Sequence, residues 1–273
     1  MAAEVTALEL AALGAVSFSV GVLSGTVGMA LGIIRLPVML VAGIDPLVAG
    51  GTNLAVSVAG GAAGAWPHFR AGRVVTRIVI TMGVPALIGS FIGGRFAHFA
   101  QAWLLLTVVA LFLFWSSVVM FTQVFGPRSS EDARTAAGGS DAGPAGPQKL
   151  RVWCEAGWGV VIGLIGGAVG LVLGTVRMPT LINVLRMDAA RAVGTNTVVG
   201  ILAGLFGFLG HLWNGQVDWL LVAVMGSTAM AGSFLGARFM GRIDPRRLRV
   251  LIALVVLAMA PVTMWRAYLD FTA

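Results

Sequence analysis

Two arginines stand in otherwise apolar, glycine-rich stretches, and each lies two residues before a proline. Residues 25–37 read GTVGMALGIIRLP and contain Arg35, and residues 167–179 read GAVGLVLGTVRMP and contain Arg177. A guanidinium group donates paired hydrogen bonds to planar or tetrahedral oxyanions. A glycine break leaves backbone N–H groups free, and a helix N-terminus adds partial positive charge. The two stretches therefore predict a site for a compact, multiply charged oxyanion.

The composition places these arginines in a membrane. Of the 273 residues 58% are hydrophobic and 11% are charged, and the mean hydropathy is +0.94. Several apolar stretches have the roughly 20 residues that cross a bilayer as a helix, so we expect an all-α polytopic membrane protein with about 8–10 membrane segments. An arginine that faces lipid is costly, so both arginines are expected to face the bundle or a hydrated cavity. Snorkelling to a headgroup or capping of helix carbonyls is the alternative.

The chain matches itself over about 75 residues, at an offset of 142 to 143 residues, which is too long a register for chance. The matched positions are Gly28 with Gly170, Gly32 with Gly174, Arg35 with Arg177, Thr52 and Asn53 with Thr195 and Asn196, and His68 with His211. We therefore assign residues 1–125 and 153–273 to two transmembrane repeats. Residues 126–152, rich in Gly, Pro, Ala and Ser, read as a flexible linker.

Loop charges predict that the two repeats are inverted. The loop that contains Arg70, Arg73 and Arg77 has a counterpart at 211–219 without Lys or Arg. By the positive-inside rule these equivalent loops face opposite sides, with the N-terminus outside and the linker in the cytoplasm. The apolar piece after each glycine break is too short to cross comfortably, so we expect a half-helix or a re-entrant hairpin. Inverted repeats with broken helices are typical of secondary transporters.

Further candidate ligands come in equivalent pairs. The GTN turns that open two spans supply Thr52 with Asn53 and Thr195 with Asn196, as donors to the anion or as helix caps. The backbone beside the arginines is contributed by Gly28, Gly32, Gly170 and Gly174. His68 and His211 could carry a coupling proton or lie at the membrane interface. The histidines lack a third metal ligand at suitable spacing, and Cys154 is the only cysteine, so no metal, disulfide or cofactor is expected.

Other classes of function find less support. No phosphate-binding loop indicates ATP use. An intramembrane hydrolase would need one nucleophile–base pair, for which Ser24 and a histidine are the candidates. The histidines are duplicated in the two repeats, whereas Ser24 has Gly166 as its repeat partner, so we do not expect an enzyme. A cation transporter would need an acidic residue inside the membrane, and no predicted span contains a carboxylate. The basic residues, net charge +7, lie mostly between apolar segments and orient the protein, so no nucleic acid is expected as partner.

The repeated pattern resembles the TauE/SafE sulfite exporter family. Pro37 lies nine residues after Gly28, and Pro179 lies nine residues after Gly170; AGGTN…HFRAG and AVGTN…HLWNG follow over 49–72 and 192–215. The resemblance implies a multi-pass carrier of the bacterial inner membrane that exports sulfite, sulfoacetate or similar sulfur anions. The usual three glycines after the first break are replaced by MAL and LVL, which gives the arginines more weight as ligands.

The sequence predicts a secondary transporter of small inorganic or organosulfur anions that works by alternating access. An anion channel, or a carrier for another oxyanion or a carboxylate, is the alternative. Glycine-rich faces at 60–64 and 89–94 permit close helix contact, and we expect them to pack within one chain, with a homodimer as the other possibility.

Overall fold

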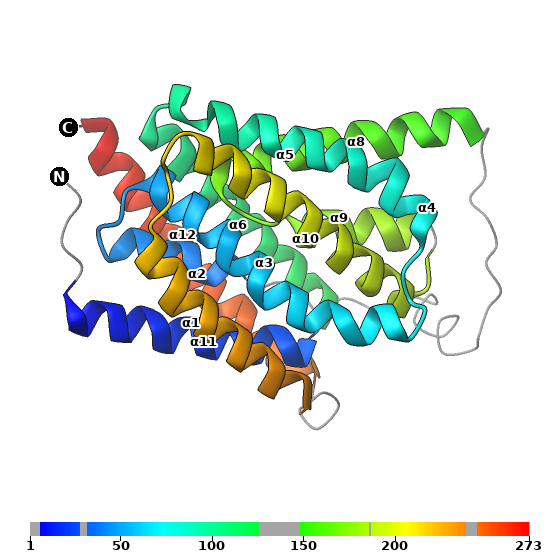
Figure 1. The fold of residues 1–273 in the computed structure, drawn as a ribbon, viewed down its shortest axis with the longest axis horizontal. Helices are drawn as coiled ribbons and strands as arrows, with labels where there is room; N and C mark the ends of the chain where they lie inside the picture. The colour runs from blue at the N-terminus through cyan, green and yellow to red at the C-terminus, as the bar shows by residue number, and fades with distance from the viewer. Residues whose placement is uncertain (1–5, 28–31, 126–147, 186, 239–244, 273) are drawn as a thin grey trace.

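The computed structural model describes residues 6–27, 32–125, 148–185, 187–238 and 245–272, and over these residues the fold is all-helical (Figure 1). The first half contains α1 (Ala7–Val27), α2 (Gly32–Val41), α3 (Pro46–Arg70), α4 (Thr76–Ile78), a π-helix (Val79–Gly83), α5 (Val84–Phe96), a 3-10 turn (Ala97–Phe99) and α6 (Ala102–Phe125). The second half contains α8 (Gln148–Val169), α9 (Gly174–Pro179), a π-helix (Thr180–Val184), α10 (Ala189–Trp213), α11 (Trp219–Arg238) and α12 (Pro245–Thr272). The predicted all-α class is confirmed.

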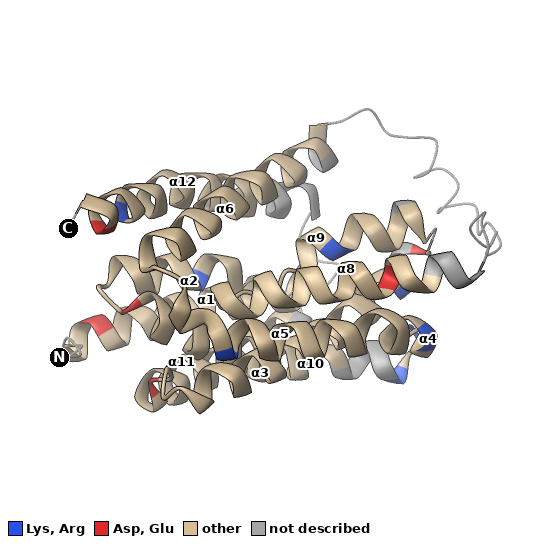
Figure 2. Ribbon diagram, turned by 90° about the horizontal axis from the view of Figure 1, so that it is seen from above, with Lys and Arg blue, Asp and Glu red and all other residues tan. Residues whose placement is uncertain are grey.

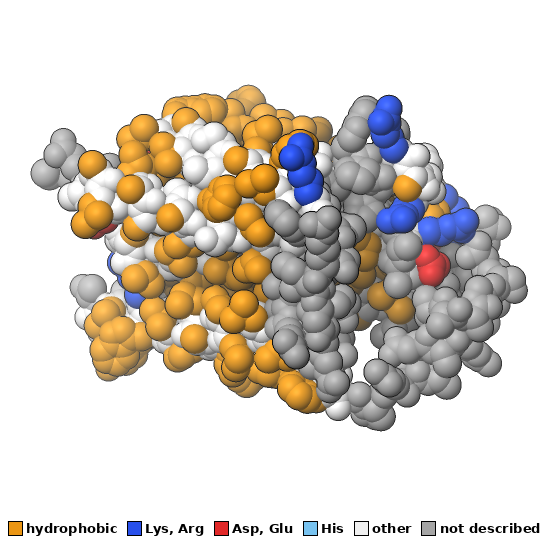
Figure 3. Space-filling view, turned by 90° about the horizontal axis from the view of Figure 1, so that it is seen from below, with side chains coloured by type: hydrophobic (Ala, Val, Ile, Leu, Met, Phe, Trp, Pro, Cys, Tyr) orange, Lys and Arg blue, Asp and Glu red, His pale blue; other side chains and the backbone are white. Residues whose placement is uncertain are grey.

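The lengths and the surface of the helices fit a membrane. Seven helical stretches in the described part are long and apolar enough to cross it, and α2 is a shorter apolar helix. Hydrophobic side chains spread over the middle of the molecule, and basic side chains gather toward one end of the face in Figure 3. Large apolar side chains such as Phe114, Trp158 and Phe234 are about half exposed, as contact with lipid tails allows. The chain is therefore a multi-pass membrane protein.

Each half begins with a long helix that stops at the glycine-rich break and is followed by a short one. Four residues separate α1 from α2, and four separate α8 from α9. The helix α2 has 10 residues, about 15 Å at 1.5 Å per residue, and α9 has only six before the π-helix Thr180–Val184. The predicted short, broken helices are confirmed.

The two halves exchange their first helices. Helix α1 packs along α11 of the second half, and α8 packs along α5 of the first half. The helices α3 and α10, which are equivalent in the two halves, pack on each other, and so do α6 and α12. The N-terminal part of α3 thereby reaches the break of the second half, where Gly50 faces Gly170.

The glycines predicted to permit close contact do so within the chain. A Cβ at Gly89 or Gly93 of α5 would collide with the α8 backbone, and a Cβ at Gly61 would lie 3.2 Å from Ile201. These faces are therefore used inside one molecule. The homodimer stays a prediction.

The chain termini and the linker lie at opposite ends of the molecule. In Figure 1 α1 begins and α12 ends at one end, whereas α6 ends and α8 begins toward the other. The first helices of the two halves therefore run in opposite directions. An odd number of passes in each half produces this arrangement, and the inverted relation of the repeats stays a prediction.

Candidate anion site

Arg35 lies on α2, is 4% exposed and is held by side chains of α3. Its Nε donates to Asn53 Oδ1 at 3.3 Å, and its Nη2 donates to Ser57 Oγ at 2.8 Å. Asn53 and Ser57 are four residues apart on α3, which places them on one face. A Cβ at Gly32 would lie 2.5 Å from the Ser57 hydroxyl oxygen, so a larger residue where α2 starts would displace the Ser57 side chain from Arg35. We call these side chains, Arg35, Asn53 and Ser57, the Arg35 cluster.

Arg177 lies on α9 and is 1% exposed. Its Nη1 donates to the side-chain oxygen of Asn196 at 3.2 Å and to the Asn196 carbonyl at 3.4 Å, while its buried Nε has no partner. The amide of Asn196 donates in turn to the Gly174 carbonyl at 3.2 Å. We call Arg177 and Asn196 the Arg177 cluster. A hydrogen bond from arginine to asparagine thus recurs in both halves, whereas the sequence predicted Asn53 and Asn196 as donors to the anion or as helix caps.

Neither cluster contains an acid. Arg77 pairs with Glu155, 3.5 Å from Nη2 to Oε1, whereas the described hydrogen-bond partners of Arg35 and Arg177 are neutral. A buried guanidinium without a counter-charge is costly, because hydrogen bonds to neutral groups recover only part of its lost hydration. The two clusters therefore present uncompensated positive charge to any anion that reaches them.

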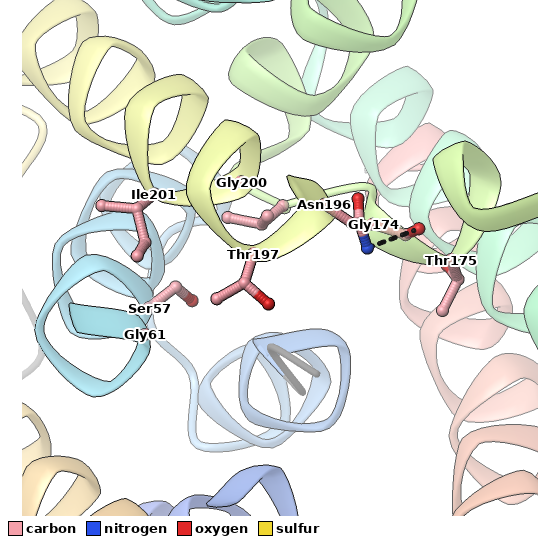
Figure 4. Close-up of a pocket in the computed structure, with 9 residues that line it drawn as sticks. Ser57, Gly61, Gly174, Thr175, Asn196, Thr197, Gly200 and Ile201 are labelled. Atoms are coloured by element: carbon pink, nitrogen blue, oxygen red, sulfur yellow. Dashed lines mark hydrogen bonds between the residues drawn. The ribbon is translucent and has the colours of Figure 1, made fainter. Parts of the chain in front are cut away.

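A small cavity lies between the two clusters. It is lined from α3 by Ser57 and Gly61, from the second break and α9 by Val172, Gly174 and Thr175, and from α10 by Asn196, Thr197, Gly200 and Ile201 (Figure 4). Ser57 belongs to the Arg35 cluster and Asn196 to the Arg177 cluster, so the cavity borders both. Its volume of about 20 Å³ suffices for one or two water molecules.

The remaining predicted ligands lie in other contacts. The Thr52 hydroxyl accepts from the Asp218 N–H at 3.1 Å, just before α11, and the Thr195 hydroxyl accepts from the Val75 N–H at 3.0 Å, just before α4. The first bond ties α3 to the start of α11, and the equivalent second bond ties α10 to the start of α4, so each joins the two halves. The threonines thus join helices of the two halves, away from the arginines, while the asparagines that follow them hold the guanidinium groups.

The glycines of the break serve the backbone. Gly170 has φ +79°, and its carbonyl accepts from Asn53 Nδ2 at 2.9 Å. A Cβ at Gly170 would collide with the backbone of Gly50, so α3 approaches the second break only with glycine there. The first break's Gly28 lies outside the described residues. The Arg35 cluster is therefore linked directly to the break of the other half.

His211 is fully buried near the end of α10. Its Nε2 lies 2.8 Å from the Gly167 carbonyl and its Nδ1 lies 2.9 Å from Gln216 Oε1. Since the Gly167 carbonyl can only accept, Nε2 carries a proton in this contact. The imidazole thus ties α10 to the end of α8, and the side chain of His68 lies outside the described residues. A coupling role for either histidine stays a prediction.

One expectation about acids was wrong. Glu155 lies inside α8, within a stretch long and apolar enough to span the membrane, and is 3% exposed. Its carboxylate pairs with Arg77 and accepts from the Thr81 hydroxyl. The apolar segment of the sequence begins at residue 156, whereas the helix extends to Gln148, so a carboxylate just outside the apolar run became part of the span.

Ser57 was also missed as a partner of Arg35. The signal was present, because Asn53 and Ser57 are spaced four apart in a segment predicted to be helical. Its counterpart in the second half, 143 residues later, is Gly200, so the duplicated pattern did not mark the position.

Helices broken near two buried arginines, in a multi-pass bundle, are typical of membrane transporters. The profile described as Sulfite exporter TauE/SafE matches residues 13–262. The chain belongs to the TauE/SafE sulfite exporter family. It is 26% identical to a protein of Bacillus subtilis (strain 168) named Probable membrane transporter protein YdhB. The aligned region of 226 residues covers 82% of this chain and 87% of that protein. No solved structure matches the chain.

Proposed function

We propose that the protein is a secondary transporter that exports small sulfur-containing anions, such as sulfite or organosulfonates, across the bacterial plasma membrane. The observation that carries the proposal is the pair of buried arginines without acidic partners, with a cavity between their clusters. Guanidinium groups match oxyanions in charge and in hydrogen-bond geometry. Membership of the sulfite exporter family supports sulfur oxyanions as the first substrates to test.

Alternating access between inverted repeats is the mechanism we propose. A cavity of about 20 Å³ is smaller than a sulfur oxyanion, so the anion needs the cavity to widen. The cavity is walled by α3 of one half and by α9 and α10 of the other. A movement of one half against the other would therefore open it, which favours a carrier over a permanently open channel.

Efflux from proteoliposomes tests the proposal. We expect the wild-type protein to release preloaded sulfite, and Arg35→Gln and Arg177→Gln each to slow release at least about tenfold, because each removes a buried charge that only an anion compensates. Arg238→Gln is the matched control, since this arginine ends α11 over the Phe234 ring, 4.5 Å from its centroid.

The substrate panel separates the alternatives. Sulfate, thiosulfate, sulfoacetate, phosphate, chloride and a carboxylate are tested beside sulfite. Transport of the carboxylate alone would make the protein a carrier for another anion class, and a conductance far above carrier turnover would make it a channel. Unchanged sulfite efflux in both arginine variants would contradict the proposed site.

A further inference from the structure

We infer that Ser57 is a further anion-binding residue: its hydroxyl donates a hydrogen bond to an anion that lies between Ser57 and Arg177, and Gly200 leaves the space this anion needs. The inference rests on the proposed function and makes the two arginines unequal. Arg35 acts on the anion through Ser57, whereas Arg177 acts on it directly.

The hydrogen bonds of Ser57 leave its proton available. A serine hydroxyl has one proton to donate and two lone pairs to accept with. The Arg35 Nη2 donates to Ser57 Oγ at 2.8 Å and occupies a lone pair. The hydroxyl makes no other hydrogen bond among the described residues, and Ser57 lines the cavity (Figure 4). The proton can therefore point into the cavity.

The charge of Arg35 strengthens this donor. A hydroxyl that accepts from a cation is polarised, so its own O–H becomes a better donor, and the effect is largest in a low-dielectric interior. The other hydroxyls of the cavity are engaged differently. Thr197 donates to the Val193 carbonyl at 2.8 Å, and Thr175 lies 3.3 Å from the Ser116 hydroxyl. Ser57 is thus the cavity hydroxyl that is coupled to an arginine.

In the first half the charge of Arg35 acts on the anion through the Ser57 hydroxyl, whereas in the second half Arg177 donates to the anion itself. Arg177 keeps its Nε–H buried and without a partner among the described residues, so this donor is free to meet an anion once the cavity beside Asn196 and Gly200 widens. Gly200, the counterpart of Ser57, lines the cavity without a side chain. A Cβ there would lie 4.0 Å from Arg177 Nη1 and 2.9 Å from Val172 Cγ1. Glycine therefore keeps this position free of a side chain 4.0 Å from Arg177 Nη1, and any larger residue would also press on Val172.

Sulfite binding to the purified full chain, measured by titration calorimetry and by ligand-induced thermal stabilisation, tests the inference. We expect Ser57→Ala to weaken sulfite binding about tenfold or more, because a charged ligand loses a buried donor. Ser57→Thr keeps the hydroxyl and should stay within about threefold of wild type. Ser17→Ala is the matched control, because this fully buried serine donates to the Met225 carbonyl at 2.7 Å and should leave sulfite affinity unchanged.

Gly200→Ser provides a second, independent variant. The added side chain fills the cavity beside Arg177, so we expect sulfite binding to weaken about tenfold or more while the ligand-free protein stays folded. Gly157→Ser on α8 is its control, because a Cβ there meets nothing within 4 Å. If Ser57→Ala fails to fold, Gly200→Ser decides the question.

The outcomes distinguish this inference from the proposed function. Wild-type affinity for sulfite in Ser57→Ala, or in Gly200→Ser, would overturn the inference and leave the transporter assignment standing. Absence of binding of every anion of the panel to the wild-type protein would instead overturn the proposed function, on which the inference rests.

Discussion

At the scale of single residues, the site holds two arginines with neutral partners. Asn53, Ser57 and Asn196 satisfy part of each guanidinium but leave its charge uncompensated. An acid in the same place would neutralise the arginine permanently and compete with the substrate. Neutral partners therefore keep the arginines positioned and available.

Exchange of one neutral partner for an acid tests this role. Asn196→Asp would place a carboxylate about where Asn196 Oδ1 now lies, 3.2 Å from Arg177 Nη1. We expect sulfite binding to be lost, because the carboxylate pairs with Arg177, while the melting temperature of the ligand-free protein reports the ion pair gained against the lost bond from Asn196 Nδ2 to the Gly174 carbonyl. Thermal denaturation and calorimetry measure the two effects.

A second asparagine provides the control for this exchange. Asn214 Oδ1 accepts from Arg95 Nη1 at 2.8 Å, at the ends of α10 and α5, away from the cavity. Asn214→Asp makes the same chemical change beside an arginine and should leave sulfite affinity at the wild-type value. Retained binding in Asn196→Asp would show that Arg177 does not meet the anion.

The sequence singled out the four residues of the two arginine–asparagine pairs but not the pairing itself. Arg35, Arg177, Asn53 and Asn196 follow from a spacing that occurs twice, and the structure shows each asparagine accepting from its arginine. The direction of a threonine side chain depends instead on which helix start lies beside it. That neighbour comes from the other half of the chain, so local spacing could not give it.

At the scale of helices, the close contact of α8 with α5 of the other half depends on glycines that are four residues apart. Gly159, Gly163 and Gly167 of α8 face the backbone of the π-helix and α5, where a Cβ would collide with main-chain atoms. Small residues with this spacing let helix backbones approach closely. The spacing is visible in the sequence, but the partner helix is not, because the pairing of α8 with α5 joins segments far apart in the chain.

Gly163→Ala should separate α8 from α5. The new Cβ would collide with the Ala86 carbonyl, which is backbone and cannot rotate away, so we expect a loss of about 1–3 kcal/mol of stability. Gly157→Ala on the same helix meets nothing within 4 Å and should not destabilise the protein. Denaturation in detergent compares them, and equal stability would contradict the close contact.

The breaks of the helices were predicted, but their π-helices were not. Val79–Gly83 lies just before Pro85 and Thr180–Val184 just after Pro179. Proline has no N–H for the regular helical ladder, which favours local rearrangement nearby. Proline marks the place from sequence, whereas the choice of a wider turn depends on the packed neighbours.

At the scale of the whole molecule, basic residues gather at the end where α3 meets α4 and α8 begins (Figure 2). Arg70 ends α3, Arg73 and Arg77 follow it, and Arg238 ends α11. The opposite end holds Glu9 of the first turn of α1 and Asp218 just before α11. The positive-inside rule therefore predicts a cytoplasmic linker and an N-terminus outside, and this orientation stays a prediction.

Cysteine labelling in intact cells tests this orientation, because Cys154→Ser gives a cysteine-free chain. We expect a membrane-impermeant maleimide to label Leu8→Cys, a position 81% exposed in the first turn of α1, and to label Ser140→Cys in the linker only after permeabilisation. The reverse pattern would invert the orientation of the protein. Labelling of both positions from outside would require an even number of passes in the first half, and the two repeats could not then be inverted copies.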